Sequence, residues 1–330
     1  MTEQIKNVEN NTAVENKTMN KRVYGVCGIK NRMAMWNASF EKYARELENG
    51  NVFATDKALK YAIRNKWKLD GEKQLAIRSY KIDKAKGDVT PMSLEERYTQ
   101  LFEKSPDKFK AEEVYKQLFG LRDVKNFGVA FAVKKRNASI TGAVQIGLGM
   151  NKLGIPYQHN MQILAPYRNA GGDSEKTAEK QAFTNGMQVV VDKAEYLYDF
   201  SIIPQMYQDY VDLGLTEGYT EEDYENFKEA LRLSATTVQS ASKKGVDTSF
   251  IMYVETKPDY YLQNLGDYFK YTDNGETIEI EFTDKALLEN NPNIEKIEVL
   301  FDDKTYTLKN FPENTEYKNI YTLEEVKVGK

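Results

Sequence analysis

Large and small side chains alternate strictly between Gly128 and Val133, a pattern that predicts a β-strand. Val129, Phe131 and Val133 alternate with glycine and alanine. Because successive strand residues face opposite sides, one face of this segment is bulky and the other is almost bare. A bare strand face allows the backbone or the bases of a partner to approach closely.

The same segment continues into a predicted β-hairpin with a basic turn. A second apolar run covers Ser139 to Leu148, and three cations, Lys134, Lys135 and Arg136, occupy the turn before it. Cations at a hairpin tip suit contact with a phosphate backbone. A turn of solvated charges is the alternative, because exposed charges are common on any protein surface.

Near the front of the chain, the pattern predicts a strand followed by a helix. Arg22 to Ile29 is an apolar run, and Thr55 to Lys68 has the period of an amphipathic helix with Thr55 or Asp56 as its N-cap. Apolar residues line one side of this helix and cations line another. The apolar side is Leu59, Ala62, Ile63 and Trp67, and the basic stripe is Lys57, Lys60, Arg64 and Lys68.

The second half of the chain repeats the alternation of strands and a helix. Tyr196 to Pro204 has the character of a strand, Thr220 caps a helix that ends near Gly245, and Ser249 to Glu255 is a last apolar strand. With the hairpin between the halves, the order is strand, helix, strand, strand, helix, strand. This is the split βαββαβ pattern of an α+β, ferredoxin-like fold.

Three further segments surround this core. Residues 69–121 contain a capping box at Ser93 to Glu96 and predict a helical insertion. Residues 149–192 are interrupted by glycine and proline and predict a long irregular segment, a kind that is usually functional or disordered. Residues 257–330 predict a β-rich extension, since isoleucine and phenylalanine alternate with glutamate from Ile278 to Phe282.

Composition indicates a globular chain. It has 330 residues, 41% of them hydrophobic, which is enough for a substantial core. No run approaches the ~20 apolar residues of a membrane span, and residues 1–20 are polar, so we expect a disordered tail there and a cytoplasmic protein. The single cysteine, Cys27, lies within an apolar run and is expected to be buried.

The overall charge does not favour nucleic-acid binding. Lys and Arg number 46 against 50 Asp and Glu, which gives a net charge of -4. Binding depends on how the cations are arranged on one surface, however, and acidic residues can be segregated elsewhere. The charge balance therefore leaves a local basic interface possible.

The residues needed for several catalytic mechanisms are missing from the sequence. The chain has one histidine, His159, and one cysteine, Cys27, which are too few for a zinc site of Cys and His ligands. A Ser-His-Asp or Cys-His catalytic arrangement would have to use His159. No phosphate-binding Gly-x-x-x-x-Gly-Lys motif occurs. Asp56 is the nearest candidate for holding a catalytic cation beside a phosphate, but its place at a helix start favours N-capping.

Three segments that occur in the order typical of one protein family carry a resemblance to it. They are the strand Phe127 to Val133 with Ile140 to Gln145, the segment Gly50 to Arg64, and the segment from Thr220 to Glu255. In these segments the chain resembles the CRISPR-associated backbone subunit of type I Cascade complexes, Cas family seven, and the subtype I-B branch fits best. It departs from the family's pattern at Ile29 to Trp36, where many members have Pro-Asn-Gly-Asp, and at Gly142-Ala143 in place of Gly-Pro.

The resemblance implies a crRNA-binding backbone subunit that polymerises along the guide RNA and presents it to complementary target DNA in antiviral defence. It implies an RRM-like palm over residues 21–256, with the helical insertion at 69–121 and a thumb-like insertion at 149–192. The expected partners are CRISPR RNA, target DNA, copies of itself in a head-to-tail filament and other Cascade subunits. We expect no membrane contact, no cofactor, no metal and no enzymatic activity.

A guide RNA must keep its base edges free for pairing, so the protein is expected to hold sugar and phosphate. A metal-dependent RNase subunit of a type III-like effector complex is the first alternative, and a protein-assembly module that binds no nucleic acid is the second. Met161, in the thumb-like insertion, could wedge against a base rather than contact sugar or phosphate. The expected RNA-binding residues are Lys30, Arg32, Lys57, Lys60, Arg64, Lys134, Lys135, Arg136, Gln145, Lys152, Met161 and Arg168.

Overall fold

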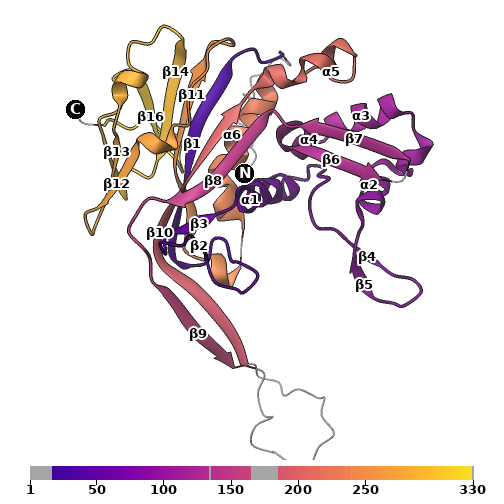
Figure 1. Cartoon of the computed structure of the whole chain (residues 1–330), viewed down its shortest axis with the longest axis horizontal. Helices are drawn as coiled ribbons and strands as arrows, with labels where there is room; N and C mark the ends of the chain where they lie inside the picture. Colours follow the sequence, from indigo (N-terminus) through magenta and orange to yellow (C-terminus); the bar gives the residue numbers. More distant parts are fainter. Residues whose placement is uncertain (1–16, 134, 165–184, 239, 329–330) are drawn as a thin grey trace, which may run out of the picture.

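A mixed α/β architecture with a large central sheet is seen in a computed structural model, which describes residues 17–133, 135–164, 185–238 and 240–328. The nine-stranded sheet is antiparallel except for the pair of β14 and β16 at one edge (Figure 1). Its strands, in spatial order, are β16 (Thr315–Asn319), β14 (Ile294–Phe301), β11 (Val246–Thr256), β1 (Arg22–Ala34), β10 (Asn185–Ile202), β8 (Val144–Asn151), β3 (Val52–Ala54) and β2 (Arg45–Glu46), with β9 (Gln158–Leu164) paired to β10.

Two helices cover one face of this sheet. They are α1 (Asp56–Leu69) and α6 (Glu221–Thr237), whose buried side chains join Val23 and Cys27 of β1 in one hydrophobic core. The predicted apolar side of α1 is confirmed, since all four of its residues are buried. Thr220 caps α6 in a capping box with Asp223, as predicted. The cap satisfies backbone N–H groups that a helix start leaves without partners.

A second, smaller sheet covers the opposite face. Its strands are β12 (Phe269–Asp273), β13 (Ile278–Phe282) and β15 (Tyr306–Lys309). Their apolar residues form a separate core with Tyr24, Val26 and Phe250 of the central sheet. Residues 257–330 contribute these three strands together with β14 and β16. The strands β14 and β16 of the same segment nevertheless extend the central sheet, because β14 pairs with β11.

The predicted basic hairpin forms, but its second run is split. Strands β6 (Gly128–Val133) and β7 (Arg136–Thr141) pair with each other, while β8 leaves them and enters the central sheet. The break falls at Gly142, where a Cβ would lie 2.3 Å from the carbonyl oxygen of Asn126. Only glycine allows this close crossing of two backbones.

The hairpin belongs to a lobe that lies beside α1 (Figure 1). This lobe contains most of the predicted helical insertion. Ser93 caps its first helix through the expected capping box with Glu96. The lobe also carries a small β-hairpin. The elements are β4 (Tyr80–Ile82), β5 (Val89–Pro91), α2 (Leu94–Phe102), α3 (Ala111–Phe119) and α4 (Arg122–Phe127), with a 3-10 turn at Pro106–Lys108.

Short elements complete the described chain. Helix α5 (Gln208–Asp212) follows a 3-10 turn at Pro204–Tyr207, and further 3-10 turns lie at Ala241–Lys243, Gly266–Tyr268 and Lys285–Leu287. Helix α6 ends at Thr237, eight residues before the predicted end near Gly245. In the described part of the chain, no helix is both long and apolar enough to cross a membrane.

The front boundary differs from the predicted tail over residues 1–20. Residues 1–16 lie outside the described part, but Lys17 to Asn20 contact the core. Thr18 forms a β-bridge with Thr220, and the Met19 side chain is buried. The buried Met19 places the start of the packed chain before residue 20.

Candidate nucleic-acid interface

A two-stranded ribbon projects from the central sheet (Figure 1). It pairs β9 with the first half of β10, from Gln158 opposite Val191 to Leu164 opposite Asn185. The prediction of an irregular segment at 149–192 is wrong for these residues, while residues 165–184 lie outside the described part. Since β10 continues to Ile202 in the central sheet, the ribbon is a direct extension of the core.

The ribbon exposes apolar side chains on both faces. Met161 and Ile163 are 40% and 46% exposed on one face, and Met187 is 39% exposed on the other. The prediction for Met161 therefore concerns an accessible side chain. Arg168, the other predicted contact in this insertion, lies outside the described residues. Exposed apolar groups on a projecting ribbon can insert against bases or pack on a neighbouring chain.

A loop at the base of the ribbon exposes aromatic residues that sequence reasoning missed. The backbone N–H of Ala44 donates to Oε1 of Gln158 at 2.9 Å, which ties the loop to β9. In this loop Phe40 is fully exposed and Tyr43 is 37% exposed. Exposed rings offer sequence-tolerant stacking surfaces for single-stranded nucleic acid. The one available signal was an isolated Phe40 among polar residues, which has no strand or helix period.

Helix α1 separates its predicted cations into exposed and partly buried ones. Lys57 is exposed beside the Asp56 carboxylate, whereas Lys60 donates to Asp56 at 3.1 Å and lies over the Phe127 ring. Arg64 also lies over Phe127. The helix therefore offers Lys57 to a partner, while Lys60 and Arg64 stack on the ring that ends α4.

Arg64 stabilises the fold through a buried acid. Its Nε is 3.4 Å from the carboxylate of Asp123, whose side chain is fully buried and also accepts from the backbone N–H groups of Leu75 and Ala76. Burial lowers the pKa of Arg64, and the Asp123 charge opposes that shift. Removing Arg64 would leave a buried carboxylate without its counter-charge, so this cation has a structural role in addition to the predicted one.

Four other predicted cations also have partners within the chain. Lys30 lies near Asp247 and Asp302, and Arg32 forms an ion pair of 2.5 Å with Glu195. Lys152 donates to the carbonyl oxygen of Gly266 at 2.7 Å. Arg136 donates to the carbonyl oxygens of Phe109 and Lys135.

The hairpin tip and its neighbours complete the predicted set. Lys135 is exposed and has a φ of 66°, and Lys134 lies outside the described residues. Gln145 is exposed, and its amide donates to the carbonyl oxygen of Gly142 at 2.7 Å. Arg136 of the hairpin donates to the carbonyl oxygen of Phe109, whereas Arg64 of α1 lies over the Phe127 ring. The cations of the hairpin and those of α1 are therefore held by different residues.

The candidate catalytic side chains have structural contacts. The pKa of Asp56 is lowered because its hydrogen bond and ion pair with Lys60 outweigh the opposing effect of burial. The N-cap of α1 is Thr55, and Asp56 occupies the first turn. The His159 ring packs edge-on against Tyr157 at 4.5 Å. Among the described residues, no group of three or more His, Cys, Asp or Glu side chains could hold a metal ion.

The fold and this interface define an α/β protein with a mostly antiparallel central sheet, a projecting ribbon and a basic lobe. The family described as "CRISPR-associated protein Cas7" matches residues 21–298. The chain therefore belongs to the Cas7 family, which confirms the family suspected from the three sequence segments.

Other comparisons give weaker likenesses. No curated protein matches the chain. A solved chain described as "CRISPR RNA-guided surveillance complex, pre-nicking" is similar at 11% identity and a TM-score of 0.47, covering 73% of this chain and 80% of that one. Another, described as "CRISPR RNA-guided surveillance complex", has 10% identity and a TM-score of 0.43, covering 94% and 95%. The family assignment rests on the sequence match.

Proposed function

We propose that this Cas7 protein is the crRNA-binding backbone subunit of a type I Cascade complex, of the subtype I-B branch. It polymerises head to tail along CRISPR RNA in the cytoplasm and presents the guide to complementary target DNA with other Cascade subunits. The observation that carries the proposal is the family match over residues 21–298, which includes nearly all of the described core. The subunit binds and does not catalyse.

An RRM-like palm is part of this proposal. The order β11, β1, β10, β8 within the central sheet is the order of a split βαββαβ unit, with α1 and α6 on one face. We propose a palm at 21–256, preceded by the packed residues 17–20, with insertions at 69–121 and 149–192 and an extension at 257–330. The exposed ribbon then takes the part of the thumb.

The covered sheet directs where RNA can lie. In an RRM, bases stack on the face of the sheet that has no helices. Here that face is buried under β12, β13 and β15, with Phe250 and Ile280 fully buried. RNA is therefore held at the rim, by the ribbon, the loop at its base and the exposed cations Lys57 and Lys135.

The alternative, a metal-dependent RNase of a type III-like complex, has less support. Its best candidate carboxylate, Asp56, is already engaged by Lys60 at the start of α1. The two functions are separated by incubating the assembled complex with complementary target RNA and a divalent ion. The backbone function predicts intact target RNA, and cleavage that is lost in Asp56→Asn would establish the alternative.

The cheapest test of the proposal is the nucleic-acid content of the purified protein. Co-expression with CRISPR RNA should give RNA-bound oligomers with a high absorbance ratio at 260 and 280 nm, because head-to-tail surfaces do not close on themselves. A sharp RNA-free monomer that persists at low salt with CRISPR RNA supplied would contradict the proposal.

The exposed cations give the sharper test. Lys57→Ala and Lys135→Ala should weaken binding of two unrelated guide RNAs equally and reduce the salt slope by about one unit for each phosphate that the variant no longer neutralises. Lys270→Ala is the control, since Lys270 is also exposed but lies on β12 of the covering sheet. Unchanged slopes in the double variant would remove these residues from the interface, and a sequence-selective loss would indicate base readout.

A further inference from the structure

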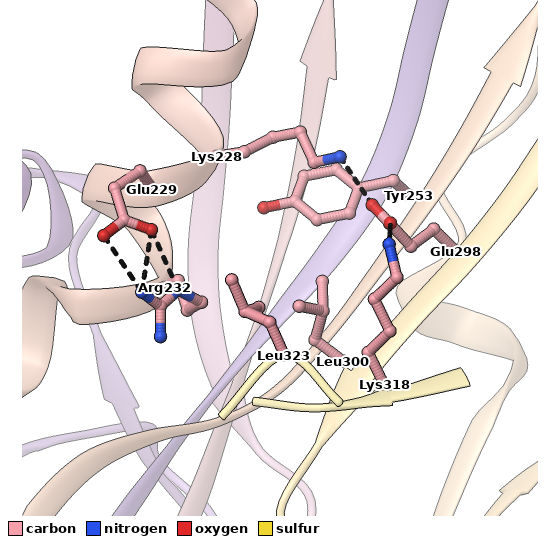
Figure 2. Close-up of a pocket in the computed structure, with 8 residues that line it drawn as sticks. All are labelled: Lys228, Glu229, Arg232, Tyr253, Glu298, Leu300, Lys318 and Leu323. Carbon is pink, nitrogen blue, oxygen red and sulfur yellow. Dashed lines mark hydrogen bonds and ion pairs between the residues drawn. The ribbon is translucent and has the colours of Figure 1, made fainter. Parts of the chain in front are cut away.

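A small cavity lies between α6 and the edge of the central sheet, away from every residue of the proposed RNA interface. Its volume is about 120 Å³, far above the roughly 10–15 Å³ that one water molecule needs. Three cations and two carboxylates line it, above a floor of Leu300 and Leu323. In Figure 2 these side chains surround one common space.

Tyr253 contributes a buried hydroxyl without a partner. The residue is 1% exposed on β11, and among the described residues its hydroxyl has no hydrogen-bond partner. In Figure 2 the hydroxyl points into the space enclosed by the lining side chains. A buried donor without a partner costs free energy, and nothing in the packing of the ring on Phe200 and Tyr224 requires it.

Both carboxylates of the cavity are already paired with cations. Glu298 accepts from Lys228 at 2.5 Å and from Lys318 at 2.7 Å, one lysine on each carboxylate oxygen. Both carboxylate oxygens of Glu229 accept from Arg232, whose remaining nitrogen donates to the carbonyl oxygens of Ile320 and Tyr321.

Donors remain. An ammonium group has three N–H donors, and Lys228 and Lys318 each donate one hydrogen bond to Glu298. Together with the Tyr253 hydroxyl, which can also donate, these ammonium groups leave several donors without acceptors, whereas each carboxylate already has a cation beside it. Such a site selects a group that only accepts hydrogen bonds, which is the character of an ionised carboxylate or phosphate.

The charge of the lining selects between these anions. Lys228, Arg232 and Lys318 oppose Glu229 and Glu298, which leaves one positive charge in excess. Burial works to raise the pKa of Glu298, but Lys228 and Lys318 outweigh it and hold that pKa at about 2, so Glu298 stays ionised at neutral pH. A single negative charge balances the lining, whereas a doubly charged phosphate would overcompensate it.

We propose that this cavity binds a monocarboxylate, with the carboxylate held by Lys228, Lys318 and Tyr253 and a short apolar stem on Leu300 and Leu323. The carboxylate belongs either to a free small acid or to an acidic side chain of a neighbouring chain. The site is separate from the RNA interface and does not depend on the proposed function.

Sodium butyrate tests the proposal on the full-length protein. Butyrate should raise Tm relative to sodium chloride at equal ionic strength, because a ligand that binds the native state stabilises it. The neutral isostere butyramide should not. Acetate should bind more weakly than butyrate, since it buries less apolar surface on the leucines. Equal effects of butyrate and chloride would overturn the site.

Tyr253→Phe is the decisive variant, because it removes only the hydroxyl and keeps the packed ring. It should fold at least as stably as the parent and bind butyrate about tenfold more weakly, the worth of one charge-assisted hydrogen bond. Tyr271→Phe is the matched control, since it removes another buried hydroxyl without a partner that lies in the other core. Unchanged butyrate affinity in Tyr253→Phe would refute the assignment.

A second measurement identifies the source of the carboxylate. Excess butyrate is added to the assembled oligomer, which is then sized. Dissociation shows that butyrate displaces an acidic side chain of a neighbouring chain, and Tyr253→Phe should then also assemble more weakly. An intact oligomer that binds butyrate as tightly as the free subunit assigns the cavity to a free acid.

Discussion

The two faces of strand β10 are built from different chemistry. Ala194, Tyr196, Tyr198 and Phe200 face the helices and belong to an apolar core. The alternate residues face the covering sheet, where three of four are charged. Lys193 pairs with Asp273, Glu195 accepts from Tyr306, and Asp199 accepts from the backbone N–H of Gly266, with Leu197 between them.

The difference shows two ways of fixing a layer on a sheet. The helix face depends on shape, since it is filled by rings and has little room for change. The covering sheet is positioned by specific polar contacts set among apolar ones. Removing one partner of such a contact lowers stability by leaving a buried polar group unpaired. Substitutions on each face should therefore fail for different reasons.

The largest effect is expected at Glu195. It is fully buried, pairs with Arg32 and accepts from Tyr306. Burial raises the pKa of Glu195, while Arg32 and Tyr306 act against that rise. Glu195→Ala should lower the free energy of unfolding by about 3–5 kcal/mol, because it leaves two donors, the half-buried Arg32 guanidinium and the buried Tyr306 hydroxyl, without their acceptor. Glu195→Gln should cost less, since an amide oxygen still accepts.

Urea denaturation measures both Glu195 variants. A loss under about 1 kcal/mol in Glu195→Ala would show that the polar network does not hold the covering sheet. Arg32→Ala should be destabilised as well, so a weaker RNA affinity in that variant would not by itself place Arg32 on the RNA.

Two glycines of β1 compare the faces directly. A Cβ at Gly25, on the helix face, would lie 2.3 Å from the carbonyl oxygen of Met252 and 2.4 Å from the Phe200 ring. At Gly28, on the other face, the nearest atom is Cβ of Phe250 at 3.2 Å. Gly25→Ala should cost about 3 kcal/mol, and Gly28→Ala about 1 kcal/mol or less. Equal losses by urea denaturation would remove the contrast in packing.

Glu298 tests a charged cluster at the edge of the helix face. Its folded pKa of about 2 lies below the ordinary value of 4.5, so its ion pairs stabilise the protein fully above pH 4.5. That contribution is lost progressively as the pH falls from 4.5 toward 2. Glu298→Gln should therefore show a smaller fall in urea midpoint between pH 5 and pH 3 than the parent. An identical fall in both proteins would contradict the assignment.

The smallest effects are expected at two buried hydroxyls, one on each face. Tyr253 lies on the helix side and Tyr271 on the covering side, and neither hydroxyl has a hydrogen-bond partner among the described residues. Replacing either residue with phenylalanine should change the free energy of unfolding by less than about 1 kcal/mol, and in the stabilising direction. A clear loss of Tm would mean that the hydroxyl is satisfied.

Local pattern by itself determined much of the fold. The capping boxes at Ser93 and Thr220, the apolar side of α1 and the burial of Cys27 all follow from spacing, because caps and helical periods involve residues a few positions apart. The Cas7 family was also accessible, since its segments are contiguous in the chain.

The tertiary structure decided the partners of the charges and strands. Sequence spacing gave Lys57 and Arg64 one basic stripe, but only packing places Asp123 against Arg64 and leaves Lys57 in solvent. The sequence did not predict the ribbon, because β9 and β10 satisfy each other's backbone groups across a long insertion. No local hydrophobic period indicates such a pairing. The chain encodes its elements locally, whereas the environment of each charge depends on residues distant in sequence.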